Sequence, residues 1–225
     1  MNGIRLFVET GKKKTIVGAV DWPGWCRVGR DEGTAVQTLL DYAPRYAQTL
    51  AHTGIPFPTL DLAQLHVIER HDGNATTDFG APAIILDTDT TPIAPNELAR
   101  LQAILTACWQ NFDQAEQQAA GKELRKGPRG GGRDLDKIVA HVLESERDYL
   151  RRLAWKYKKE RGISQNEELQ QVRQAVLAAL QAAANGELPE QGPRGGAIWP
   201  PRYFIRRAAW HTLDHVWEIE DRVAA

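Results

Sequence analysis

Two histidines near the end of the chain, His211 and His215, have a spacing that metal sites on helices use. Residues four apart on a helix stack on one face about one turn from each other, where two imidazoles can bind the same ion. The apolar residues around them recur at helical spacing, so this face is expected to point into a helical bundle. The stripe consists of Phe204, Ala208, His211, His215 and Ile219.

A third histidine, His141, lies in an earlier segment that also has helical spacing. On a helical wheel it falls about 60° from Ile138, at the edge of the predicted buried arc, where a neighbouring helix can meet it. Three imidazoles from two helices would leave one coordination position open, as in catalytic zinc sites. Imidazole also suits other metals, so the pattern predicts a divalent ion such as Zn, Ni or Fe without choosing between them.

Each of these histidines can instead have a role without a metal. A buried histidine is often hydrogen-bonded within a core, and a pair at this spacing also occurs on solvated faces without a ligand. Three further histidines, His52, His66 and His71, are expected on the surface or in a strand. The carboxylates expected to orient the metal ligands are those of Glu144, Asp214 and Glu218.

Composition and charge narrow the function classes. With 42% hydrophobic and 25% charged residues, the chain has the composition of a soluble globular protein. The net charge of −1 gives no attraction to nucleic acid or anionic lipid. The chain lacks an apolar run of the ~18 residues that a membrane helix requires. We therefore expect a cytoplasmic protein with no nucleic-acid and no membrane partner, in which Cys26 and Cys108 are free, buried thiols.

Residues 1–91 have the pattern of a small antiparallel sheet with a helix. Helical spacing begins after Asp31, an expected N-cap, and Pro44 should kink or split that helix because proline lacks a backbone donor. Residues 76–95 are rich in Thr, Asp, Pro and Ala, which is typical of an extended connector. The expected strands cover residues 4–9, 15–20, 26–28 and 65–69.

Residues 92–225 are expected to form four amphipathic helices, which together make a four-helix bundle. The predicted fold class is therefore α+β, with a small domain at residues 1–91 followed by the bundle at 92–225. The signals for helix starts are Pro95, Asp134, the capping box Ser164-Gln-Asn-Glu167 and the pair Pro200-Pro201.

The segments around the three histidines resemble the DinB-like superfamily of four-helix bundles. Residues 138–153 and 207–215 carry the resemblance, with one histidine on the second helix and an H-x-x-x-H pair on the fourth. That superfamily includes isomerases and transferases that work with mycothiol or bacillithiol. The resemblance implies that His141, His211 and His215 bind a divalent metal and that a low-molecular-weight thiol serves as a cofactor. It does not fix the reaction.

The N-terminal part is similar to the HicB-like antitoxin module. The carriers of this resemblance are the early strand pair, the turn Asp21-Trp-Pro-Gly24, the stretch Gly29-Arg-Asp-Glu32 and the helix after it. The resemblance implies the fold of this part and a protein partner that binds to it.

The sequence Gly-Pro-Arg-Gly-Gly occurs twice, at residues 127–131 and 192–196, before the second and fourth expected helices. Exposed N–H groups at helix starts can hold a carboxylate or phosphate. If both segments lie at the metal end, Arg129, Arg133 and Arg194 would bind an anionic cofactor such as the thiol. A short link between the second and third expected helices favours an antiparallel arrangement of these two helices, which would bring the glycine segments together. In the DinB-like family the two helices are parallel, which would separate the segments. Two unrelated flexible turns are a further alternative.

Two functions of different classes follow. The first is a metal-dependent enzyme, a thiol-dependent transferase or isomerase or a hydrolase, that acts on a small-molecule substrate; the ion would lower the pKa of a thiol or water. The second is a non-enzymatic stress or protein-interaction protein that binds a partner through the HicB-like part. The oligomeric state, with a homodimer as one option, does not follow from the sequence.

Overall fold

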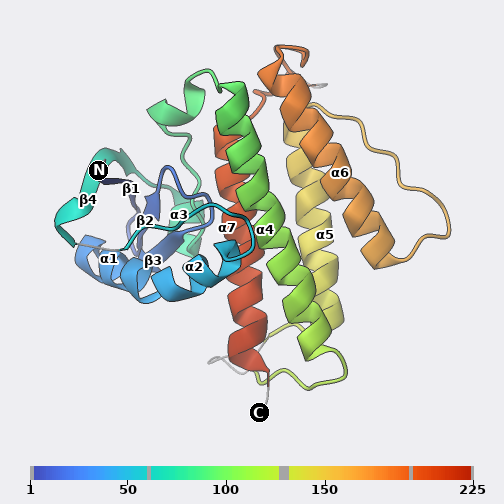
Figure 1. The fold of residues 1–225 in the computed structure, drawn as a ribbon, viewed down its shortest axis with the longest axis horizontal. Helices are drawn as coiled ribbons and strands as arrows, with labels where there is room; N and C mark the ends of the chain where they lie inside the picture. Colours follow the sequence, from blue (N-terminus) through green and yellow to red (C-terminus); the bar gives the residue numbers. More distant parts are fainter. Residues whose placement is uncertain (1–2, 60–61, 127–131, 193–194, 224–225) are drawn as a thin grey trace.

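The computed structural model describes residues 3–59, 62–126, 132–192 and 195–223. A small sheet unit lies on one side of the last helix, and the other bundle helices lie on its other side (Figure 1). The predicted α+β class is confirmed. The strands are β1 Ile4–Thr10, β2 Thr15–Ala19, β3 Cys26–Gly29 and β4 Leu65–Asp72. The helices are α1 Glu32–Asp41, α2 Ala43–Leu50, α3 Ala75–Phe79, α4 Pro95–Ala119, α5 Leu135–Arg152, α6 Gln165–Ala184 and α7 Pro201–Arg222, with 3₁₀ turns η1 Leu62–Gln64 and η2 Asp87–Thr90.

The sheet has the strand order β3-β2-β1-β4. The pairs β1–β2 and β2–β3 are antiparallel, as expected. The fourth strand, β4, pairs in parallel with β1, because the chain passes through α1 and α2 before it returns to the sheet. The sheet is therefore mixed rather than antiparallel throughout, which corrects that part of the prediction.

The helix after β3 is divided where the sequence predicts. The Asp31 side chain accepts a hydrogen bond from the backbone of Thr34 at 2.8 Å and caps α1. Pro44 lies in the first turn of α2, where its missing N–H is not needed. The helix α1 packs against β2 and β3, whereas α2 contacts α4 and carries the fully buried Tyr46.

The expected connector contains more structure than the sequence indicates. Asn74 and Thr77 form a capping box that starts α3, and η2 follows after a short extended stretch. The buried Glu9 carboxylate of β1 accepts hydrogen bonds from the backbone N–H groups of Ala83 at 3.0 Å and Ile84 at 3.2 Å. These bonds tie the connector to the sheet.

In the bundle, α4 and α7 run in one direction and α5 and α6 in the other (Figure 1). The second and third bundle helices are thus parallel, and residues 153–164 carry the chain back along the bundle between them. The predicted starts are confirmed: the Asp134 side chain caps α5, and Ser164 and Glu167 form the capping box of α6.

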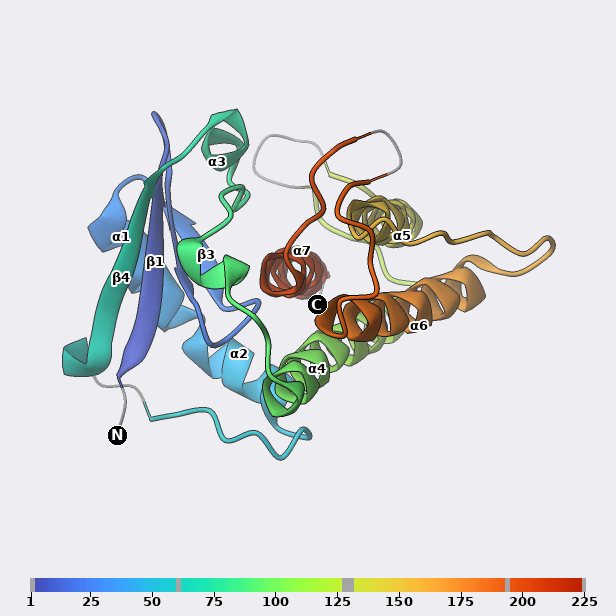
Figure 2. The ribbon, with the colours of Figure 1, turned by 90° about the horizontal axis from the view of Figure 1, so that it is seen from above.

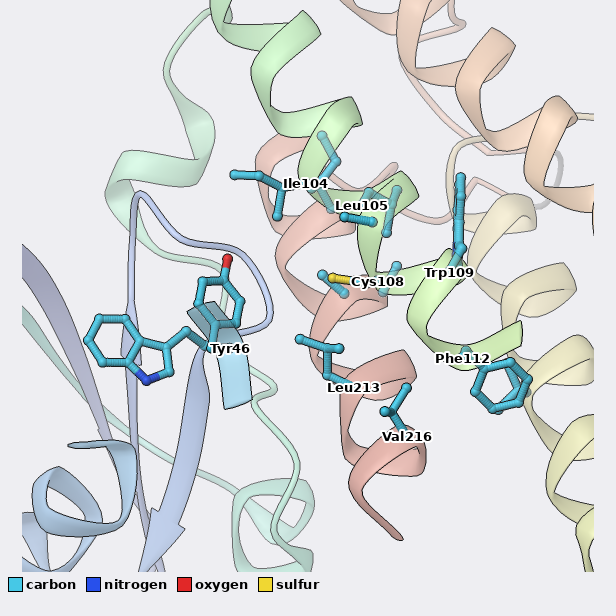
Figure 3. Close-up of a cluster of buried hydrophobic side chains, with 14 of the residues drawn as sticks. Tyr46, Ile104, Leu105, Cys108, Trp109, Phe112, Leu213 and Val216 are labelled. Carbon is cyan, nitrogen blue, oxygen red and sulfur yellow. The ribbon is translucent and has the colours of Figure 1, made fainter. Parts of the chain in front are cut away.

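One hydrophobic cluster extends from the sheet unit into the bundle. Figure 3 shows Tyr46 on the sheet side of α7, facing Leu213, while Trp109 and Phe112 lie on the far side of α4. Because α7 is covered from both sides (Figure 2), its predicted stripe is buried throughout. The division into domains at residues 1–91 and 92–225 stays a prediction.

Side chains on the sheet-facing side of α7 fill the junction between the two parts. The Trp217 ring lies 4.9 Å from the Tyr42 ring, and Trp210 packs in a second cluster with residues of β1, β2 and β3. Cys26 and Cys108 are free and buried, as predicted. None of the helices in the described ranges combines the length and the apolarity needed to cross a membrane.

Candidate metal centre

Three histidines from two helices converge on one point. His141 comes from α5, and His211 and His215 come from α7. Their ligand nitrogens all lie within 4.8 Å of one another, and the Nε2 atoms of His141 and His211 are 3.2 Å apart. A tetrahedral ion with bonds of roughly 2.0–2.1 Å holds its nitrogen ligands roughly 3.3–3.4 Å apart. The His141 and His211 nitrogens therefore have nearly the separation of two ligands on one ion, and the ligand nitrogen of His215 lies within 4.8 Å of both.

The spacing of the histidines on α7 and the position of α5 beside it place the three rings together. The four-residue spacing places His211 and His215 on the same face of α7, with ring centroids 4.7 Å apart. The antiparallel neighbour α5 brings the His141 ring to 5.1 Å from the first ring and 5.0 Å from the second. His141 is half-buried, while the other two are only 7% and 8% exposed. Solvent and small molecules can thus approach from the α5 side.

Two of the three histidines, His141 and His211, are held in the neutral form that binds metal. Burial, and then the neighbouring imidazoles His215 and His141, lower the pKa of His211 well below its usual value. Burial and the charge of Arg133 lower the pKa of His141. Both rings are therefore neutral at neutral pH, with lone pairs available for an ion.

A carboxylate orients one of the rings. His215 Nδ1 donates a hydrogen bond to Glu218 Oε2 at 2.8 Å, which leaves Nε2 for a ligand on the other side of the ring. The hydrogen bond from His215 lowers the pKa of Glu218, and Arg222 forms an ion pair with the same carboxylate. Arg222 also donates to the backbone carbonyl of Arg133 at 2.8 Å, which joins the end of α7 to the start of α5.

The donor set fits a divalent ion such as zinc, because three imidazoles and a carboxylate that orients one of them recur in such sites. The buried Nδ1 of His211 has no hydrogen-bond partner within the described ranges. His211 Nε2 faces His141 Nε2, so Nδ1 is the ring nitrogen that no described group orients.

The chain matches no protein-family model, no curated protein and no solved structure. The candidate function therefore depends on this geometry alone, and both family resemblances stay predictions.

The other carboxylates proposed from the sequence lie elsewhere. Asp214 points to the sheet unit, where its Oδ1 accepts a hydrogen bond from Arg27 at 3.2 Å. Glu144 is exposed and lines a separate cavity between α5 and α6. Of the histidines expected outside the site, His52 and His66 are exposed, and His71 pairs with Glu69 on β4. Of the three predicted carboxylates, Glu218 is therefore the one that contacts a histidine of the cluster, His215.

The arginines predicted to bind an anionic cofactor are only partly described. Arg129 and Arg194 lie outside the described residues. Arg133 is exposed just before α5, and its charge acts on His141 and His211. Gly132 is beside the end of α7, whereas Gly192 lines a cavity at the far end of α5. The first glycine segment, residues 127–131, lies outside the described residues, so a meeting of the two segments at the histidines stays a prediction, as does binding of an anion by Arg133.

Two side chains beside the histidines were missed from the sequence. The Tyr149 ring on α5 lies 5.7 Å from the His211 ring, and Arg207 precedes His211 by one turn on α7. The spacing carried only part of this signal, because Tyr149 is eight residues after His141 and so lies about two turns along α5 and roughly 80° around it.

Proposed function

We propose that His141, His211 and His215 bind a divalent metal ion and that the protein is a metal-dependent enzyme acting on a small molecule. The observation that carries this proposal is the convergence of three nitrogen ligands from two helices. A bound ion would supply a Lewis acid that polarises a thiol or water near neutral pH. The neutral state of His141 and His211 and the hydrogen bond between His215 and Glu218 support it.

Different residues of the chain have different roles in the proposed site. The three imidazoles hold the ion, and Glu218 fixes the ring of His215. The buried position of α7 keeps water away from the protein side of the ion. The half-buried side of His141 leaves an approach for a substrate.

The finer identity of the enzyme rests on the sequence resemblance. A DinB-like role would make the reaction a thiol-dependent transfer or isomerisation, with Zn, Ni or Fe as the ion and the cytoplasm as the compartment. The parallel arrangement of α5 and α6 agrees with that family's expected helix directions. Hydrolysis with a metal-polarised water is the other reaction that the same ligands support.

Elemental analysis of protein purified without chelator tests the metal site. We expect the native chain and a His66→Ala control on exposed β4 to carry stoichiometric metal. His211→Ala and His141→Gln should lose most of it while far-UV circular dichroism stays unchanged. His141 is the less buried ligand, so its variant keeps the test valid if His211→Ala does not fold. Full metal content in folded His141→Gln would refute the site.

Exposed apolar side chains on the sheet unit favour a second candidate, an interaction protein. Phe79 on α3 is 83% exposed, and Ile68 on the edge strand β4 is 41% exposed. If the partner is a second copy of this chain, Phe79→Ser should change the oligomeric state in sedimentation velocity, whereas His141→Gln should not. An unchanged sedimentation coefficient for Phe79→Ser would argue against self-association through this surface.

A further inference from the structure

Arg207 and Tyr149 form a pair beside the three histidines, one from each of the helices that carry them. Arg207 lies one helical turn before His211 on α7. Tyr149 lies on α5 with its ring centroid 5.7 Å from that of His211, and Arg207 Cζ is 5.9 Å from the Tyr149 ring. Both side chains are half-buried. A guanidinium and a phenol thus lie about one turn from the proposed ion.

The contacts of Arg207 are all neutral. Its Nη1 donates to the backbone carbonyl of Pro82 at 2.6 Å, and its Cζ lies 4.8 Å from the Trp210 ring. Within the described ranges, no carboxylate forms an ion pair with it. Its neighbour Arg206, by contrast, pairs with Asp89 at 2.5 Å. Arg207 is therefore held in place by neutral groups, and its charge has no counter-ion among the residues that the structure describes.

Charges of both signs lie near the histidines, with Glu144 and Glu218 acting on His141 and two arginines acting on His211. Arg133 and Arg207 both act electrostatically on His211, and each opposes its protonation. The nearby Arg222 is neutralised by Glu218. A divalent ion would add further positive charge at the same place. A half-buried arginine that no described carboxylate pairs with has N–H donors available for an anion at this place.

We propose that Arg207 and Tyr149 bind a carboxylate of the substrate, one helical turn from the ion. Arginine matches the planar carboxylate with two parallel N–H donors, and the Tyr149 hydroxyl adds a further donor. The substrate class is then a small molecule with a carboxylate at one end and the group that meets the metal at the other. This inference rests on the proposed metal site, since it places the second end of the ligand there.

Dicarboxylates of graded length test the subsite. The protein is loaded with Co²⁺, and its visible absorption is followed during titration with acetate, malonate, succinate or glutarate. Acetate has one carboxylate and can bind only the ion, whereas a dicarboxylate of suitable length can bind both the ion and Arg207. We expect one of the three to bind on the order of tenfold or more tightly than acetate, as one charge-assisted hydrogen-bonded pair provides.

Arg207→Gln should abolish that preference without changing Co²⁺ content or acetate affinity, and Tyr149→Phe should reduce it. Arg207→Lys keeps the charge and should retain part of the preference. Arg100→Gln is the matched control, because Arg100 also donates to a backbone carbonyl and stacks on an indole, but on α4 beside Trp22.

The results separate the two proposals. A native protein that binds Co²⁺ but prefers no dicarboxylate, or an Arg207→Gln variant that keeps the preference, overturns the subsite alone. A native protein that takes up no Co²⁺ overturns both the metal site and the subsite.

Discussion

Glu218 connects a proposed metal ligand to the rest of the protein, because its carboxylate accepts from His215 Nδ1 and pairs with Arg222. Replacing it by Gln keeps the shape but removes the charge that makes the imidazole a stronger ligand. We expect Glu218→Gln to weaken metal affinity by roughly 10–100-fold, measured by competition with a chromophoric chelator. Glu220→Gln, which removes a surface partner of Arg45, is the control. Equal affinities for the two variants would contradict this role.

Glu146 is a buried acid that the proposed site does not use. Burial raises its pKa to about 7, and Arg173, with Nε 3.6 Å from the carboxylate, only partly opposes this. The folded state therefore holds its proton more tightly than the unfolded state, so this group's contribution is fully present below its ordinary pKa of 4.5 and is lost as the pH rises through 7.

The neutral variant Glu146→Gln should remove this loss. We expect it to be more stable than the native protein at pH 8 by on the order of 1–3 kcal/mol and nearly equal at pH 4, measured by urea unfolding. Arg173 keeps a partner, since it donates to Asp113 at 2.7 Å. A stability difference that does not vary with pH would show that the carboxyl group titrates normally.

At the scale of elements, one of the contacts between the sheet unit and α7 is a cation packed between two rings. The Arg27 guanidinium of β3 lies between two rings, 4.3 Å from Tyr42 and 4.1 Å from Trp217, and pairs with Asp214. Asp214 is partly exposed, so it stays solvated without this partner. The contribution of Arg27 is therefore mainly packing between the rings.

Arg27→Ala should lower the free energy of unfolding by about 2–3 kcal/mol, because it leaves a gap between two aromatic rings. Arg27→Met fills the same space and should lose less than about 1 kcal/mol. Urea denaturation at one pH compares the two variants. If Met is as damaging as Ala, the ion pair rather than the packing holds α7 to the sheet.

At the scale of the whole molecule, one continuous core joins the sheet unit to the bundle. Parts that share a core unfold together, so we expect a single urea transition in which tryptophan fluorescence and far-UV circular dichroism coincide. Trp25 in the sheet unit, Trp109 in the bundle and Trp217 at the junction report on all three regions. Two separate transitions would instead support independent domains at residues 1–91 and 92–225.

Local features of this fold could be predicted from the sequence. The Asp31 and Asp134 caps, the break at Pro44 and the capping box at Ser164 are all present. The buried stripe of α7, including His211 and His215, is present as well. Each of these features depends on residues within a turn or two of one another, so the local sequence is sufficient to determine it.

The tertiary structure alone decided which distant residues meet. It placed β4 parallel to β1, brought His141 to the pair on α7, turned Asp214 away toward Arg27, and left Arg207 without a counter-ion among the described residues. None of these outcomes follows from spacing along one element. They depend on how far each helix is rotated and shifted against its neighbours, and that is set by the packing of the whole core at once.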